Sequence, residues 1–79
     1  MRERVLRTMS DVFALGPGEL PEDPSVETVA GWDSLHHLEL MLGLELEFGV
    51  QISTEAMPEL TSLEAIEEHL AEQGVPASA

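Results

Sequence analysis

The basic side chains of this chain all lie within its first seven positions, at Arg2, Arg4 and Arg7. Of its 16 acidic residues only Glu3 precedes Thr8, and no Lys or Arg follows Arg7. Most carboxylates therefore have no cation to pair with inside the chain, and the repulsion between them opposes a compact state. Two explanations remain open for this pattern: recognition by basic partners, or solubility alone.

Length and composition exclude several classes of protein. We expect 79 residues to form a single domain over 1–79, with 75–79 as a frayed tail. The absence of cysteine excludes disulfides and thiolate metal sites, and the net charge of −13 argues against binding nucleic acid or an anionic membrane by charge. No apolar run is long enough to span a membrane, and no signal peptide is recognised. We expect a cytoplasmic monomer with basic protein partners.

Apolar spacing predicts an all-α fold of four helical stretches. The first covers 3–15 and is ended by Gly16 and Pro17. The second begins at Asp33 or Ser34 and ends at Phe48, before Gly49. A short third stretch begins at Ser53 or Thr54 and ends near Pro58. The fourth begins with a capping box, in which Thr61 is the cap and Glu64 its partner, and it ends at Gly74.

The stretch 16–33 is predicted to be an irregular loop, because its prolines and glycines interrupt any helix. Ordered loops of this length in small domains are more often functional than idle. Leu20, Val26 and Val29 are the side chains that we expect to pin it onto the helices.

The second predicted helix carries two apolar rows, where a surface helix normally has one. One row, expected in the core, is Leu40, Met41, Leu44 and Phe48. The other lies nearly opposite and consists of Leu35, Leu38, Leu42 and Leu46. This second row either faces a partner or ligand, or packs beneath the 16–33 loop.

Ser34 is the main candidate for chemistry. A plain helix-start serine is the simplest interpretation, and a hydrolase nucleophile is excluded because no G-x-S-x-G elbow surrounds it. The three histidines lack metal-ligand spacing, and no phosphate-binding loop or EF-hand pattern occurs. A helix start does, however, stabilise a phosphate ester without any Lys or Arg, because free amides and the helix dipole face it.

The residues around Ser34 resemble the D-S-L signature of the acyl carrier protein family. The resemblance extends over nearly the whole chain and is carried by Gly31-Trp32-Asp33-Ser34-Leu35, by Leu38-Glu39-Leu40, by Leu44-Glu45-Leu46-Glu47-Phe48-Gly49-Val50 with Ile52, and by Thr61-Ser62-Leu63. It implies a four-helix bundle with a long first loop and a short third helix. It also implies a freestanding carrier, not an enzyme, with 4′-phosphopantetheine attached to Ser34 by a phosphopantetheinyl transferase.

The same resemblance implies roles for further residues. Asp33 matches the residue that helps the transferase hold its magnesium. The positions that match the family's contacts with acyl-loading and acyl-processing enzymes, or with cargo, are Leu35, Leu38, Glu39, Leu42, Glu45 and Ile52. His36 and Leu46 stand where fatty-acid carriers commonly have acids, which favours a specialised pathway such as polyketide-type synthesis.

Other functions stay open at this point. The chain could be a fatty-acid or aminoacyl carrier, although the glycine-rich motif of peptidyl carriers is missing. It could also be an acidic helical adaptor that docks a basic protein and never carries a prosthetic group. A divalent-cation binder is the third class that the acidity suggests.

Overall fold

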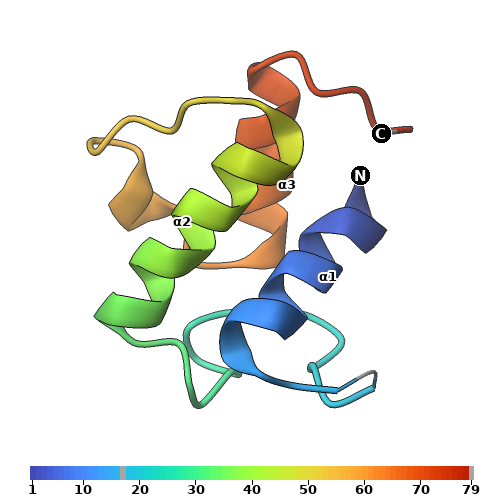
Figure 1. Cartoon of the computed structure of the whole chain (residues 1–79), viewed down its shortest axis with the longest axis vertical. Helices are drawn as coiled ribbons and strands as arrows, with labels where there is room; N and C mark the ends of the chain where they lie inside the picture. The colour runs from blue at the N-terminus through green and yellow to red at the C-terminus, as the bar shows by residue number, and fades with distance from the viewer. Residues whose placement is uncertain (17, 79) are drawn as a thin grey trace.

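The structure, a computed structural model, describes residues 1–16 and 18–78. In this part of the chain it consists of the α-helices α1 (Arg2–Phe13), α2 (Ser34–Phe48) and α3 (Leu63–Glu72), a 3₁₀ turn η1 (Met57–Glu59), and no strands. Figure 1 shows α1 and α2 side by side, with α3 behind α2 and the loop after α1 crossing below them. The fold is all-α as predicted.

The prediction of four helices is wrong, because the third stretch is only the single 3₁₀ turn η1. Pro58 lies inside this turn instead of ending it. Proline is tolerated there because the first amides of a helix have no acceptor within the helix. The residue before a proline is also disfavoured in the α conformation, so Met57 does not continue an α-helix from Ser53 or Thr54.

The core is one cluster of buried apolar side chains contributed by all three helices and the segments between them. It consists of Val5, Met9, Val29, Trp32, Leu40, Met41, Leu44, Ile52, Leu60, Leu63, Ile66 and Leu70. Val12, Phe13 and Phe48 are partly buried against it. The predicted core row of the second helix is therefore confirmed.

Helix α1 ends earlier than predicted. Its last residue is Phe13, and Ala14 adopts a left-handed conformation with φ of 54° while its amide bonds to the Ser10 carbonyl. The expected stop at Gly16 is therefore displaced by a left-handed cap that needs no glycine, and Pro17 lies outside the described residues.

Two of the three predicted side chains and a set of backbone hydrogen bonds hold the long loop. Val29 is buried and Leu20 packs against the core as expected, whereas Val26 is 43% exposed. The Val26 amide instead donates to the Thr61 carbonyl at 3.0 Å, and the Leu63 amide donates to the Pro24 carbonyl at 2.9 Å. The middle of the loop is thus held against the start of α3.

The start of α3 also corrects the predicted capping box. Ser62, not Thr61, is the N-cap, and its hydroxyl accepts a hydrogen bond from the Ala65 amide at 3.1 Å. Thr61 uses its backbone carbonyl to hold the loop, so its neighbour takes the capping position. The end of α3 is as expected, because Gly74 follows the helix and adopts a left-handed conformation with φ of 92°.

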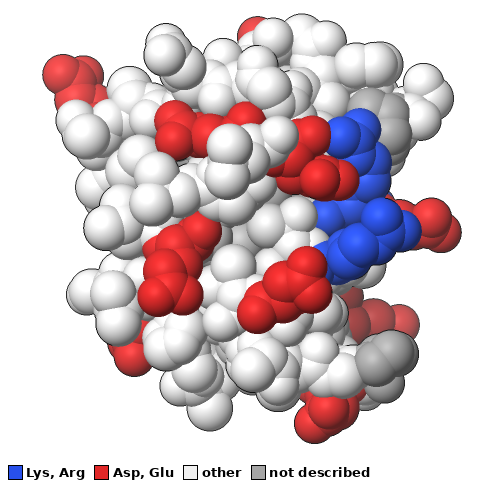
Figure 2. Space-filling model, in the orientation of Figure 1, with Lys and Arg blue, Asp and Glu red and all other residues white. Residues whose placement is uncertain are grey.

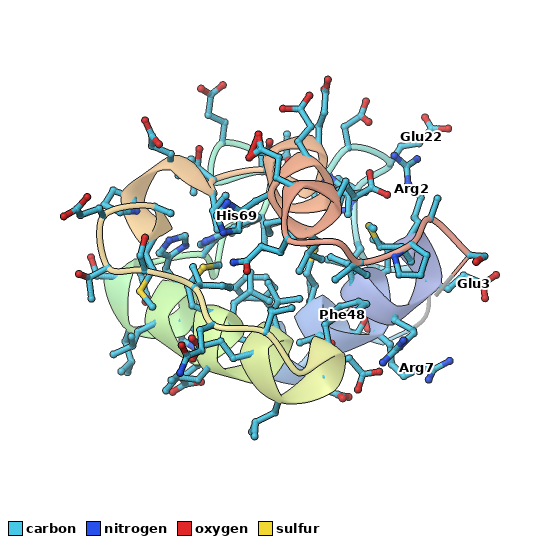
Figure 3. The ribbon with its side chains drawn as sticks, turned by 90° about the horizontal axis from the view of Figure 1, so that it is seen from above. Arg2, Glu3, Arg7, Glu22, Phe48 and His69 are labelled. Carbon is cyan, nitrogen blue, oxygen red and sulfur yellow. The ribbon has the colours of Figure 1, made fainter. Side chains whose placement is uncertain are left out.

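Two of the three arginines tie α1 to the other two helices. Arg2 pairs with Glu67 of α3 at 2.7 Å, and Arg4 pairs with Glu47 of α2 at 3.0 Å while its guanidinium lies 4.5 Å from the centre of the Phe48 ring. Figure 2 shows the arginines gathered at one side, with acidic side chains spread over the rest of this face. In Figure 3 Phe48 faces α1 and Arg7 points outward.

Candidate functional site

The beginning of α2 places Ser34 on the surface. Asp33 is the N-cap, and its carboxylate accepts the His36 amide at 2.9 Å. Ser34 is therefore the first helical residue, exposed, and among the described residues no hydrogen bond occupies its hydroxyl. The choice between Asp33 and Ser34 as cap is settled in favour of Asp33, which leaves the serine hydroxyl free for other chemistry.

Asp33 and His36 form an exposed pair beside this hydroxyl. The Asp33 carboxylate also contacts His36 Nδ1 at 2.7 Å. Hydrogen bonds from the His36 amide and then from its ring lower the pKa of the Asp33 carboxyl. The same ring hydrogen bond, with the negative charge of Asp33, raises the pKa of His36. The pair puts a titratable cation in the same first turn of α2 as Ser34.

A second histidine connects the loop before α2 to η1. The indole Nε1 of Trp32 donates to His37 Nδ1 at 2.8 Å, and His37 Nε2 lies 2.7 Å from the Met57 carbonyl oxygen. We call this arrangement Trp32–His37–Met57 the histidine bridge. Trp32 is 6% exposed and its ring lies 5.3 Å from that of Phe13, measured between centroids. The loop that precedes Ser34 is thereby anchored in the core.

A groove of about 530 Å³ opens beside Ser34. It lies between the end of the long loop, the first turns of α2 and the segment around η1. Its walls are formed by Val26, Trp32, Asp33, Ser34, His37, Thr54, Met57, Pro58 and Thr61. The groove is large enough for a slender organic chain, and Ser34 is one of the residues that line it.

The second apolar row of α2 is exposed along its length. We call it the leucine row, and its exposed fractions are 63% for Leu35, 48% for Leu38, 50% for Leu42 and 87% for Leu46. Packing beneath the 16–33 loop is therefore excluded as the reason for this row. Exposed leucines aligned on one helix are typical of an interaction surface.

The remaining predicted site residues divide into surface and core. Glu39 is exposed next to the leucine row. Glu45 is partly buried, and its carboxylate accepts the Ile52 amide at 2.7 Å, which holds the chain after α2. Ile52 is only 5% exposed and belongs to the core, so its side chain lies away from the leucine row.

Other kinds of site find no support in the described residues. No group of three or more His, Cys, Asp or Glu side chains among them is placed to hold a metal ion. None of the helices found there has the length and apolar character needed to cross a membrane.

Sequence reasoning missed Trp32 and His37 as parts of the site. The signal available was that the single tryptophan directly precedes the D-S-L motif, but its hydrogen-bond partner depends on the fold. A search of the chain against protein-family models found no match.

Proposed function

We propose that the chain is an acyl carrier protein, which carries acyl or related intermediates as thioesters on a 4′-phosphopantetheine arm attached to Ser34. The observation that carries this proposal is the free, exposed hydroxyl of Ser34 in a D-S-L motif at the first residue of α2. The chain is a substrate and shuttle for other enzymes in this proposal, not a catalyst. The specialised pathway that the sequence favours is of the polyketide type.

The residues at the start of α2 suit a phosphodiester on Ser34. Among the hydrogen bonds of the described residues, none uses the amides of Ser34 and Leu35. Such amides at the positive end of a helix dipole stabilise a phosphate group. The arm supplies the thiol that a cysteine-free chain lacks.

The leucine row supports the partner part of the proposal. Leu35, Leu38 and Leu42 offer apolar contacts, and the acidic surface with Glu39 offers charge complementarity to enzymes with basic docking patches. The row begins next to Ser34, so a partner bound to it lies beside the attachment point.

Intact-mass spectrometry tests the proposal after incubation with coenzyme A and a broad-specificity phosphopantetheinyl transferase. We expect the wild-type chain to gain the mass of one phosphopantetheine and Ser34→Ala to gain none. Ser53→Ala is the matched control, because Ser53 is also exposed but lies after α2, and it should be modified like the wild type. Modification of Ser34→Ala would contradict the assignment.

The exposed leucine row also favours a second candidate, an acidic helical adaptor without a prosthetic group. A wild-type chain that gains no mass, in a reaction where a known carrier does, would favour this adaptor. The mass of the native protein from its own host distinguishes polyketide-type cargo from fatty-acid or aminoacyl cargo.

A further inference from the structure

His37 joins two segments that lie on either side of the Ser34 groove. Trp32 ends the loop before α2, and Met57 begins η1, 20 residues further along the chain than His37. All three residues of the histidine bridge line the groove together with Ser34. The bridge therefore spans the site and does not lie remote from it.

The partners of His37 fix its protonation and its role. An indole N–H can only donate, so Nδ1 of His37 must be the acceptor. Nε2 then carries the proton of the neutral ring and donates to the Met57 carbonyl oxygen, 2.7 Å away. Because both ring nitrogens are used, the imidazole acts as a rigid spacer between the two segments.

The segment around η1 has few other hydrogen bonds to the rest of the chain. Among the described residues, its remaining hydrogen bonds stay within residues 53–60, and His37 is the partner that comes from another helix. Pro58 and Glu59 are exposed, and Met57 is only partly buried. Leu60, at the end of the segment, is buried in the core, and Ala56 and Met57 pack against it. A segment that so few hydrogen bonds tie to the rest of the chain opens locally more readily than the helices do.

We propose that His37 is a positioning residue of the carrier site, which holds Trp32 and Met57 at a fixed separation so that the transferase meets a preformed groove beside Ser34. This inference rests on the proposed carrier function. Without the bridge, the segment around η1 must be ordered when the transferase binds. That ordering cost lowers the stability of the carrier–transferase complex and of the transition state of arm transfer by the same amount. It therefore raises KM and leaves kcat unchanged.

Three variants separate this role from general stability. His37→Phe keeps a ring of similar size but has no hydrogen-bonding atoms. His37→Gln keeps an acceptor and a donor at the end of the side chain, so both hydrogen bonds can be re-formed. His69→Phe is the matched control, because His69 is a partly buried histidine of α3 that does not line the groove.

Two measurements are made on each variant at a temperature where all are folded. The first follows the indole N–H resonance of Trp32 and amide hydrogen exchange over residues 53–60, on the unmodified chain. The second determines KM and kcat for arm transfer by the transferase.

For His37→Phe we expect a shifted indole resonance, faster exchange over 53–60 than over α3, and a KM raised about tenfold, which lies within the range expected for the loss of the two hydrogen bonds of the bridge. His37→Gln should recover most of the KM, and His69→Phe should match the wild type. A folded His37→Phe with unchanged exchange and KM would overturn the proposal, as would a His37→Gln as impaired as His37→Phe.

The two proposals fail in different ways. A wild-type chain that accepts no arm overturns the carrier function, and the role of His37 in attachment with it. The resonance and exchange data on the unmodified chain still decide whether His37 holds the groove. Normal arm transfer to the wild type with no defect in His37→Phe overturns only the inference about His37.

Discussion

Leu35 and Leu44 lie on the same helix but in opposite environments. Leu44 is completely buried, whereas Leu35 is 63% exposed. Truncation of a buried leucine to alanine leaves a cavity and typically costs about 2–5 kcal/mol of unfolding free energy. We expect this loss for Leu44→Ala and a much smaller one for Leu35→Ala, measured by chemical denaturation.

The functional effects of these two changes should run in the opposite order. Leu35→Ala should weaken binding to a partner enzyme while the chain stays folded, because the leucine row loses its first member. Comparable losses of stability in Leu35→Ala and Leu44→Ala would contradict the exposed placement of Leu35.

The pair of Asp33 and His36 predicts a pH-dependent stability. Because the pKa of His36 is raised, its contribution is complete below its ordinary value of 6.5 and is lost as pH rises through the folded-state pKa. Because the pKa of Asp33 is lowered, its contribution is complete above 3.8 and is lost as pH falls through its folded-state pKa. Both contributions are complete between these two values.

His36→Gln tests this dependence, since glutamine keeps a donor but carries no charge at any pH. We expect the wild type to melt higher than the variant at pH about 5 and the difference to shrink by pH about 8. The difference should be small, because the pair is exposed and screened by water. All other side chains are the same in both chains, so the difference isolates the pair. A melting difference that is the same at both pH values would exclude a charged pair.

At the scale of elements, sequence reasoning located α2 well and the shorter segments poorly. Asp33 at the start and Gly49 at the end are strong local signals, and the structure has both as caps. The start of α3 lies one residue later than the predicted capping box of Thr61 and Glu64, because Ser62 is the N-cap. That box is a local pattern, whereas the position of Thr61 depends on the loop, whose Val26 amide donates to the Thr61 carbonyl.

This correction predicts unequal effects of two neighbouring substitutions. Ser62→Ala removes the hydroxyl that accepts the Ala65 amide, and loss of such a cap costs about 1 kcal/mol. Thr61→Ala keeps the backbone carbonyl that holds the loop, so we expect a smaller loss. Thermal and urea unfolding of the two variants measure both values. A larger loss of stability in Thr61→Ala would contradict Ser62 as the N-cap and support the predicted capping box.

The histidine bridge shows why the site could be predicted only in part. Ser34, Asp33 and the leucine row follow from one contiguous stretch of sequence and its helical spacing. The contact between His37 and Met57 depends on how residues 50–60 return across α2, which no local pattern specifies. The same is true of Ile52, whose burial follows from that return.

For the whole molecule, the charge pattern predicts that salt stabilises the fold. The net charge is −13, and among the residues that the structure describes the arginine ion pairs engage only Glu67 and Glu47. At physiological ionic strength the screening length is about 8 Å, so salt weakens repulsion between distant carboxylates more than it weakens contacting pairs. We expect the melting temperature to rise with sodium chloride.

Magnesium chloride at equal ionic strength separates screening from binding. Divalent ions also bridge neighbouring carboxylates through oxygen ligands, so we expect a further rise. A melting temperature that changes with neither salt would show that repulsion is not a significant term in the stability of the fold.

The placement of every arginine on α1 confines cleavage by trypsin to one helix. Trypsin cleaves only after Lys or Arg, so its possible cuts all fall within this one helix, and everything from Thr8 onward stays in one piece. A protease needs its target segment locally unfolded, and Arg2 and Arg4 are held by α3 and α2. The rate of tryptic cleavage therefore reports how often α1 opens, by local unfolding or by detachment from the other helices.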